Sequence, residues 1–567
     1  MFESGPHLQT AQPRAAVPHG TARTLRVESR PVSEPFETFV IRGGEVADGL
    51  GGPVRRADAL VREGRVFLLP PGAPCEARQE LSAAGAWVCP GFIDIHGHSD
   101  FASLLYPEAA SRVASGVTTE CVGNCGYGAF PLAGEVLERR RQEYQAAGLS
   151  LDWTDAEGYF RQAQAVGCAM NRVVLVGQGN IRGTVLGYGR RKATARQLAR
   201  MCSILEECLA AGAAGLSSGL AYAPGMWADT DELAALAAVV ARHGGLYASH
   251  IRNESDELLE ATDEFLEILQ RSGCRGQFSH IKTAGPRNWH KLSDLAARLS
   301  AAKNRGIAVT ADRYPYTASA TDLGTIVLPR QAVAGSQEQV LARLGDAASR
   351  GRIIRQIRRQ KGQDLQRWHD AVVITSVGEP SLRPCIGKNL RQVAEFLRAA
   401  DATEAAIQLI HDDKLLTQAI HFSMSESNLR EIYTWDFVAV GSDSSCRSRL
   451  STGEEERPHP RAYGTLARFW ELAVRGWGIL SPGAAVRRMT SLPAEILGLA
   501  DRGVLRDGAA ADIAVIEPDT FADRATYEDP CRTPAGVRFT IVNGRIVWRD
   551  GRHTGERPGQ LLRAAGV

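Results

Sequence analysis

Eight short apolar runs, most of them followed by a stretch with helical spacing, occupy the middle of the 567-residue chain. The runs are FIDIH (92–96), VTTECVG (117–123), RVVLVG (172–177), AAGLSSGL (213–220), GLYASHI (245–251), GQFSHIK (276–282), IAVTADRYPY (307–316) and DFVAVGSDS (436–444). Alternating strand and helix patterns indicate a parallel sheet, because a crossover must return the chain to the start of the next strand. Eight such units predict an α/β fold with a TIM-like (β/α)8 barrel over residues 90–499.

Different patterns lie on both sides of the barrel and inside it. Alternating apolar residues and glycine turns over 37–89 and 500–555, with an Asn543–Gly544 hairpin signal, predict one small β-sandwich built from both termini. The gap between the seventh and eighth runs is too long for one helix and predicts an inserted helical subdomain at about 325–435. Residues 1–36 lack the apolar core of a secretory signal, and we expect a disordered tail there.

Composition excludes several classes of protein. Lys+Arg 66 against Asp+Glu 64 gives a net charge of +2, which argues against nucleic acid as a partner. The chain has no run of 18 or more apolar residues, so we expect no membrane span. Eleven scattered cysteines indicate a reduced, cytoplasmic protein and no disulfide framework. No pattern indicates the oligomeric state.

Polar residues close several of the predicted barrel strands. They are His96, His98, Cys125, His250, His280 and Asp443. The carboxyl ends of barrel strands meet at one face, so these side chains are expected to converge. A lone histidine at a strand end is usually structural and a lone cysteine in a glycine-rich turn is usually inert. Six residues of types that bind divalent metals at one face instead predict a metal site.

The same residues resemble a known family. HGHSD after an apolar strand, with an aspartate on the last barrel strand, is similar to the amidohydrolase superfamily. Within it, GVTTECVGNCG, SHIRNE, SHIKTAG, GSDSS and HPRAYGT resemble the D-aminoacylase (N-acyl-D-amino-acid deacylase) family. That resemblance implies zinc-dependent hydrolysis of a small N-acyl-D-amino acid to a carboxylate and a free D-amino acid.

The resemblance also implies roles for the six polar residues. Cys125, His250 and His280 would form a tight zinc site, and His96, His98, Cys125 and Asp443 a second site that is weaker or vacant. A thiolate suits zinc because it is anionic, soft and able to bridge. Asp443 would be the general base, taking a proton from water and passing it to the leaving nitrogen.

Substrate contacts are implied in the same way. Arg461 matches a position that binds the substrate's α-carboxylate, and an arginine fork suits that group. Lys282, Tyr314 and Ser319 match further substrate-contacting positions, although Lys282 and Tyr314 also fit a solvated or packing role. Arg447, Arg449 and Arg461 form a basic cluster that fits either a solvated loop or a subsite for an acidic or larger substrate.

Two other functions fit these residues less well. A cyclic-amide hydrolase resembling hydantoinase or dihydroorotase would carry a metal-bridging lysine at the fourth strand, and AAGLSSGL has none. A non-catalytic homologue would not need Asp443 together with every candidate ligand. The preference for D over L substrates rests on the family resemblance alone.

Overall fold

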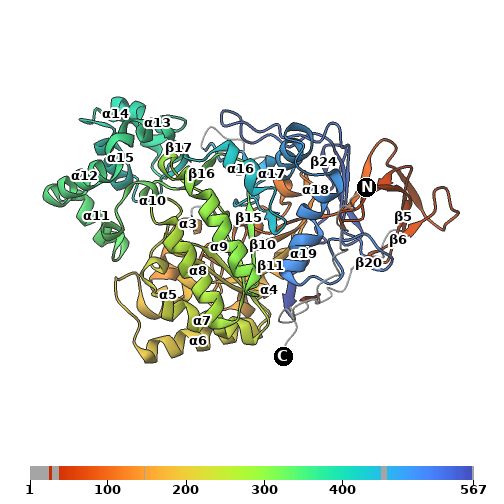
Figure 1. Ribbon diagram of the computed structural model, residues 1–567, viewed down its shortest axis with the longest axis horizontal. Coiled ribbons are helices and arrows are strands. Elements are labelled where there is room, and N and C mark those ends of the chain that lie inside the picture. The colour runs from red at the N-terminus through yellow and green to blue at the C-terminus, as the bar shows by residue number, and fades with distance from the viewer. Residues whose placement is uncertain (1–24, 28–37, 146, 449–455, 565–567) are drawn as a thin grey trace, which may run out of the picture.

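A parallel barrel forms the centre of the protein, whose computed structural model describes residues 25–27, 38–145, 147–448 and 456–564 (Figure 1). Its strands are β9 (Phe92–Asp94), β10 (Val117–Val122), β11 (Asn171–Gly177), β12 (Gly215–Gly219), β13 (Leu246–His250), β14 (Arg275–Phe278), β15 (Val309–Arg313) and β19 (Val438–Val440). Each strand pairs in parallel with its neighbours in this order. The predicted (β/α)8 architecture is therefore confirmed.

The first and last strands meet through the loops that follow them. The backbone N–H of Asp443 donates to the His96 carbonyl at 2.7 Å, and that of His98 donates to the Ser444 carbonyl at 3.0 Å. This seam closes the barrel at its carboxyl-terminal face. It also joins two predicted site loops that are more than 300 residues apart in sequence.

Helices with an apolar face surround the barrel. They include α5 (Gln178–Leu186), α6 (Ala195–Ala210), α7 (Thr230–Arg242), α8 (Leu258–Ser272) and α9 (Leu292–Asn304). Thr194 and Gln197 form a capping box at the start of α6, and Gly273 ends α8 in the left-handed conformation. In α8, Leu258, Phe265 and Leu269 recur at helical spacing and are buried in the main core.

Two further sheets combine strands from both ends of the chain. One has the order β20 (Ala509–Ala510), β6 (Arg65–Leu69), β5 (Asp58–Arg62), β2 (Phe39–Arg42) and β7 (Gln79–Ser82). The other runs β24 (Arg552–His553), β23 (Arg545–Arg549), β22 (Val537–Val542), β21 (Ile513–Ile516), β8 (Trp87–Pro90), β3 (Glu45–Val46) and β4 (Arg55–Arg56). Ile41, Val88, Ile513 and Phe539 belong to one buried core shared by the sheets, which makes them a sandwich.

The segment between β15 and β19 contains strands as well as helices. β16 (Ala318–Asp322), β18 (Gln418–Phe422) and β17 (Val372–Ser376) form an antiparallel sheet in that order. The helices are α10 (Leu323–Val327), α11 (Gln337–Gly345), α12 (Ala347–Lys361), α13 (Leu365–Ala371), α14 (Leu390–Leu397), α15 (Ala402–Asp412) and α16 (Glu426–Ile432). Sequence analysis predicted only helices, because runs as short as VVITS and QAIHF cannot be distinguished from helical turns by periodicity. Most of this segment projects from the barrel on the side away from the sandwich (Figure 1).

Near the N-terminus, only three residues of the predicted tail are described, and they are paired. Leu25–Val27 forms β1, which lies antiparallel to β25 (Leu562–Ala564), so disorder is the wrong prediction for these three residues. The rest of the predicted tail lies outside the described residues. Within the described ranges, every helix is too short or too polar to cross a membrane.

Gly97, between the two histidines of HGHSD, has a steric reason to be glycine. An added Cβ would lie 1.9 Å from Oε1 of Glu120. Glu120 is fully buried and cannot move freely, because it accepts hydrogen bonds from Arg112 Nε at 2.9 Å and from the Ser99 backbone N–H at 3.2 Å. Any side chain here would push β9 away from β10.

We therefore expect Gly97→Ala to lower the free energy of unfolding by about 1–3 kcal/mol, the usual cost of overpacking. Urea denaturation of the two proteins measures the difference. Gly52→Ala is the matched control, since its added Cβ would meet no atom within 4 Å. Equal stability of Gly97→Ala and Gly52→Ala would contradict the steric argument.

Candidate metal centre

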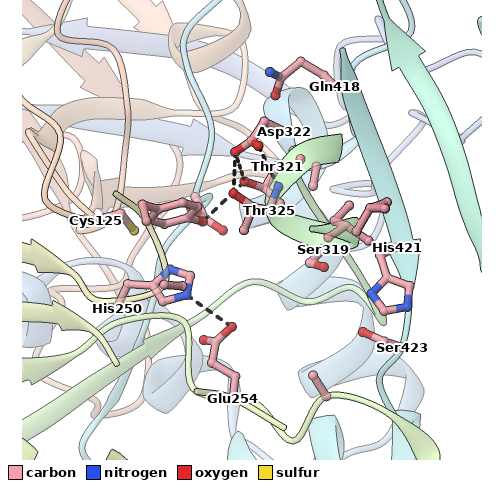
Figure 2. A pocket seen from close by; sticks show the side chains of 18 of the residues that line it. Cys125, His250, Glu254, Ser319, Thr321, Asp322, Thr325, Gln418, His421 and Ser423 are labelled. Atoms are coloured by element: carbon pink, nitrogen blue, oxygen red, sulfur yellow. Dashed lines mark hydrogen bonds and ion pairs between the residues drawn. The ribbon is translucent and has the colours of Figure 1, made fainter. Parts of the chain in front are cut away.

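The predicted site residues converge on one cleft of about 1300 Å³ at the carboxyl-terminal face of the barrel. It is lined by His98, Cys125, His250, His280, Lys282, Tyr314, Ser319, Asp443 and Arg461. His96 is fully buried next to Cys125 and does not line the cleft. Figure 2 shows the cleft from close by, with Cys125 and His250 on one side and Ser319 and His421 on the other.

The six predicted ligands lie close together in two overlapping groups. Potential ligand atoms of His96, Cys125, His280 and Asp443 all lie within 4.8 Å of one another, as do those of His250, Glu254 and His280. Cys125 Sγ is 3.3 Å from His96 Nε2 and 3.5 Å from His280 Nε2. His98 joins through its Nε2, which is 3.1 Å from Asp443 Oδ1. Buried nitrogen, sulfur and oxygen donors at such separations fit a zinc ion.

Three of these residues have an unusual backbone conformation. Cys125, His280 and Asp443 have φ values of 55°, 37° and 50°, in the left-handed region that non-glycine residues rarely adopt. Each lies just beyond a barrel strand, where the tight turn aims its side chain at the others. Backbone strain of this kind is concentrated at functional sites, where the surrounding structure maintains it.

The protonation chemistry of the cluster favours a thiolate. Burial alone would raise the pKa of Cys125. The neighbouring His96 and His280 lower it by more than burial raises it, so the pKa lies well below its usual range. Burial lowers the pKa of His96, but Asp312 and Cys125 raise it to well above its ordinary value. Protons on the imidazoles therefore stabilise a buried sulfur anion. A metal cation would replace those protons, since metal binding releases protons from its ligands.

Asp312 is a site residue that sequence analysis missed. Its Oδ1 accepts hydrogen bonds from His96 Nδ1 at 2.9 Å and from the His280 backbone N–H at 2.8 Å. Its Oδ2 accepts one from Gln277 Nε2 at 3.0 Å. The hydrogen bond between the Asp312 carboxylate and His96 Nδ1 directs Nε2 of His96 toward Cys125. This arrangement is typical of metal-binding histidines. The signal in the sequence is an acidic residue at the end of the seventh strand, in ADRYPY.

Glu254, in the SHIRNE motif, was also missed. Its Oε1 lies 2.9 Å from His280 Nδ1 and 2.5 Å from Lys282 Nζ, and its Oε2 lies 3.6 Å from His250 Nε2. Burial raises the pKa of Glu254, but Lys282 and the two histidines lower it to well below its ordinary value. Lys282 is buried and paired with this carboxylate, which rules out a solvated role for it.

Arg461 begins α17 (Arg461–Trp470) and faces the cluster. Its Nη1 lies 2.8 Å from Asp443 Oδ2, and its guanidinium carbon is 4.7 Å from the centre of the Tyr314 ring. Buried His459 supports the start of the helix: its Nδ1 accepts the Arg461 backbone N–H at 3.0 Å. The Tyr314 hydroxyl is buried and has no hydrogen-bond partner among the described residues.

The predicted basic cluster is only partly described. Arg447 pairs with Glu456, and Arg461 pairs with Asp443. Arg449 lies outside the described residues. The two arginines that are described therefore have acidic partners from the chain itself.

The contacts of Asp312 generate a test that does not depend on turnover. We expect Asp312→Asn to weaken zinc affinity 10- to 100-fold, the usual effect of removing a carboxylate behind a metal-binding histidine. Competition with a chromophoric chelator measures the affinity. Asp346→Asn, at an exposed helix cap in α12, is the control for loss of a carboxylate. Unchanged affinity in Asp312→Asn would contradict the role of Asp312.

Comparisons with known proteins agree with this geometry. The amidohydrolase family matches residues 79–548. The N-acyl-D-glutamate deacylase of Alcaligenes xylosoxydans xylosoxydans is 35% identical over 93% of this chain and 96% of its own length. The N-acyl-D-aspartate deacylase of the same organism is 33% identical over 92% and 94%.

A solved structure is similar as well. The N-acyl-D-glutamate deacylase of Bordetella bronchiseptica, complexed with zinc and a phosphonate inhibitor that mimics the tetrahedral intermediate, matches with a TM-score of 0.78. The two are 34% identical, and the match covers 94% of this chain and 100% of the other. The chain therefore belongs to the amidohydrolase family and, within it, to the N-acyl-D-amino-acid deacylases.

Proposed function

We propose that this protein is a zinc-dependent hydrolase that converts N-acyl-D-amino acids to a carboxylate and the free D-amino acid. The observation that carries the proposal is the convergence of five potential metal-binding side chains on the buried Cys125 thiolate at the cleft. Similarity over nearly the whole chain to a zinc-complexed N-acyl-D-glutamate deacylase supports the same reaction. The scattered and unbridged cysteines support a cytoplasmic location.

Two sets of side chains would hold the metal. We assign one tightly bound zinc to Cys125, His250 and His280, and a second, weaker position to His96, His98, Cys125 and Asp443. Zinc supplies Lewis-acid polarisation of the amide carbonyl and activation of a water molecule. Asp312 positions His96, and Glu254 positions His280. Each carboxylate contacts the Nδ1 atom of its histidine, and Nε2 of each ring faces Cys125.

Asp443 is the proposed general base. Burial raises the pKa of Asp443, but Arg461, His280 and His98 lower it to well below its ordinary value, so the carboxylate is ionised near neutral pH. An ionised carboxylate beside the cluster can take the proton of the attacking water and then deliver it to the leaving nitrogen. Proton transfer to nitrogen is needed because an amide anion is a poor leaving group.

Arg461, Lys282, Tyr314 and Ser319 are the proposed substrate contacts. The substrate's α-carboxylate would replace part of the Arg461–Asp443 pairing, since a guanidinium can bind a carboxylate through two parallel hydrogen bonds. The Tyr314 hydroxyl, which has no hydrogen-bond partner among the described residues, supplies a further donor at the same place. Binding there would leave the amide carbonyl directed toward the metal residues.

The hydantoinase-like alternative is less well supported. The fourth strand, β12, has the sequence GLSSG, and no lysine on it can bridge two metals. The Cys125 sulfur instead lies 3.3 Å from His96 Nε2 and 3.5 Å from His280 Nε2, where an anionic bridging ligand is needed. We therefore favour a linear amide substrate.

Asp443→Asn tests the proposed mechanism. We expect turnover to fall 10²- to 10⁴-fold, the usual contribution of a general base, because the amide cannot accept the proton. The assay is amine release from N-acetyl-D-leucine by zinc-loaded protein, together with metal analysis. Asp436→Asn, at an exposed residue preceding the same strand, is the matched control. Near-normal turnover in Asp443→Asn would remove Asp443 from the mechanism.

A further inference from the structure

Asp322 is a carboxylate in the substrate cleft that the proposed reaction does not use. It is the last residue of β16 and the N-cap of α10, and it lines the same cleft as Cys125 and His250 (Figure 2). Its Oδ1 accepts the Thr325 backbone N–H at 2.7 Å, and its Oδ2 accepts hydroxyl hydrogen bonds from Thr325 at 2.7 Å and from Thr321 at 3.5 Å. All of these donors are uncharged, and burial raises the pKa of Asp322.

Two acidic residues in contact with the predicted metal ligands, Glu254 and Asp443, are paired with cations. Glu254 lies 2.5 Å from Lys282 Nζ, and Asp443 lies 2.8 Å from Arg461 Nη1. Among the residues that the structure describes, no nitrogen of lysine, arginine or histidine lies within 4.0 Å of the Asp322 carboxylate. A carboxylate offers about four acceptor positions, so three hydrogen bonds leave room for another donor. A partly buried charge without a cation partner is unfavourable, and a cation brought by a ligand would relieve that cost.

Helix capping alone does not explain this arrangement. Capping uses Oδ1 and the Thr325 N–H, and it requires no burial. Asp346 caps α12 with the same geometry, accepting the Ser349 N–H at 2.8 Å, at an exposed position away from the cleft. Asp322 differs from Asp346 because it is partly buried and lies on the cleft wall, whereas Asp346 is exposed.

Tyr222 indicates how far Asp322 lies from the metal residues. Its ring packs edge-to-face on His250 with centroids 4.9 Å apart, and its hydroxyl lies 3.4 Å from Thr321 Oγ1. Thr321 in turn contacts Asp322. The distance from His250 to Asp322 is therefore spanned by one tyrosine side chain and two further contacts. A substrate side chain that reaches Asp322 from the metal residues has to pass Tyr222, which favours a side chain of lysine or arginine length over a short acidic one.

We propose that Asp322 determines substrate specificity by receiving the cationic end of a basic D-amino acid side chain, so that the protein favours N-acyl-D-lysine or N-acyl-D-arginine over acidic substrates. This inference rests on the proposed deacylase function. It separates the protein from relatives that are named for D-glutamate and D-aspartate. An acidic side chain near Asp322 would meet a like charge in a partly desolvated site.

Three N-acetyl substrates test the proposal: D-lysine, its uncharged analogue D-norleucine, and D-glutamate. We expect zinc-loaded protein to cleave the lysine substrate with a kcat/KM at least 10-fold above norleucine and at least 100-fold above glutamate. In Asp322→Asn the lysine-to-norleucine ratio should fall at least 10-fold. Asparagine is also a good N-cap, so the fold should be retained. Asp346→Asn, which loses a cap carboxylate outside the cleft, should keep the wild-type ratio.

Three other outcomes would contradict the specificity proposal or the function on which it rests. Glutamate cleaved as well as lysine by the wild-type protein would overturn the specificity proposal and leave the deacylase function standing. A lysine-to-norleucine ratio of kcat/KM that is unchanged in Asp322→Asn would show that Asp322 acts only as a helix cap. Failure to cleave all three substrates, and N-acetyl-D-leucine as well, would overturn the proposed function itself and the inference with it.

Discussion

Closure of the barrel between β9 and β19 is the constraint on which the site depends. Two backbone hydrogen bonds across this seam, from Asp443 to His96 and from His98 to Ser444, connect loops from the first and last strands. The buried Glu120 packs against Gly97 at the same seam, so the HGHSD loop cannot move outward without losing buried hydrogen bonds. The seam therefore places His96, His98 and Asp443 in one small volume.

A second constraint is charge. A thiolate, several imidazoles and several carboxylates share a site that is largely shielded from water, and such charges persist only when each has a partner. Asp312 supports His96, Lys282 neutralises Glu254, and Arg461 pairs with Asp443. Removing one member leaves its partner unpaired, which is why residues that need not touch the substrate are expected to affect metal affinity. Asp322 stands apart because its partner would come from the substrate.

Much of the barrel and the ligand set could be predicted from the sequence. Strand-forming runs ending in histidine, cysteine or aspartate have a clear physical meaning, since parallel strands deliver their carboxyl ends to one face. Asp312, within β15, and Glu254, in the loop after β13, could not be singled out, because a single charged residue carries no periodic signal and its partners come from other strands. The sheet of the inserted segment was missed for a related reason: β18 pairs with β16 and with β17 across long stretches of chain, and the short runs of β17 and β18 resemble helical turns.

The central claim is that this cluster performs metal-dependent hydrolysis of N-acyl-D-amino acids. The most direct measurement is the rate of amine release from the enantiomers of N-acetylleucine and N-acetyllysine, with zinc-loaded protein and with protein stripped by a chelator. We expect release from the D substrates at least 100-fold faster than from the L substrates, loss of activity on stripping, and recovery when zinc is returned. Equal rates for both enantiomers, or full activity in metal-free protein, would contradict it.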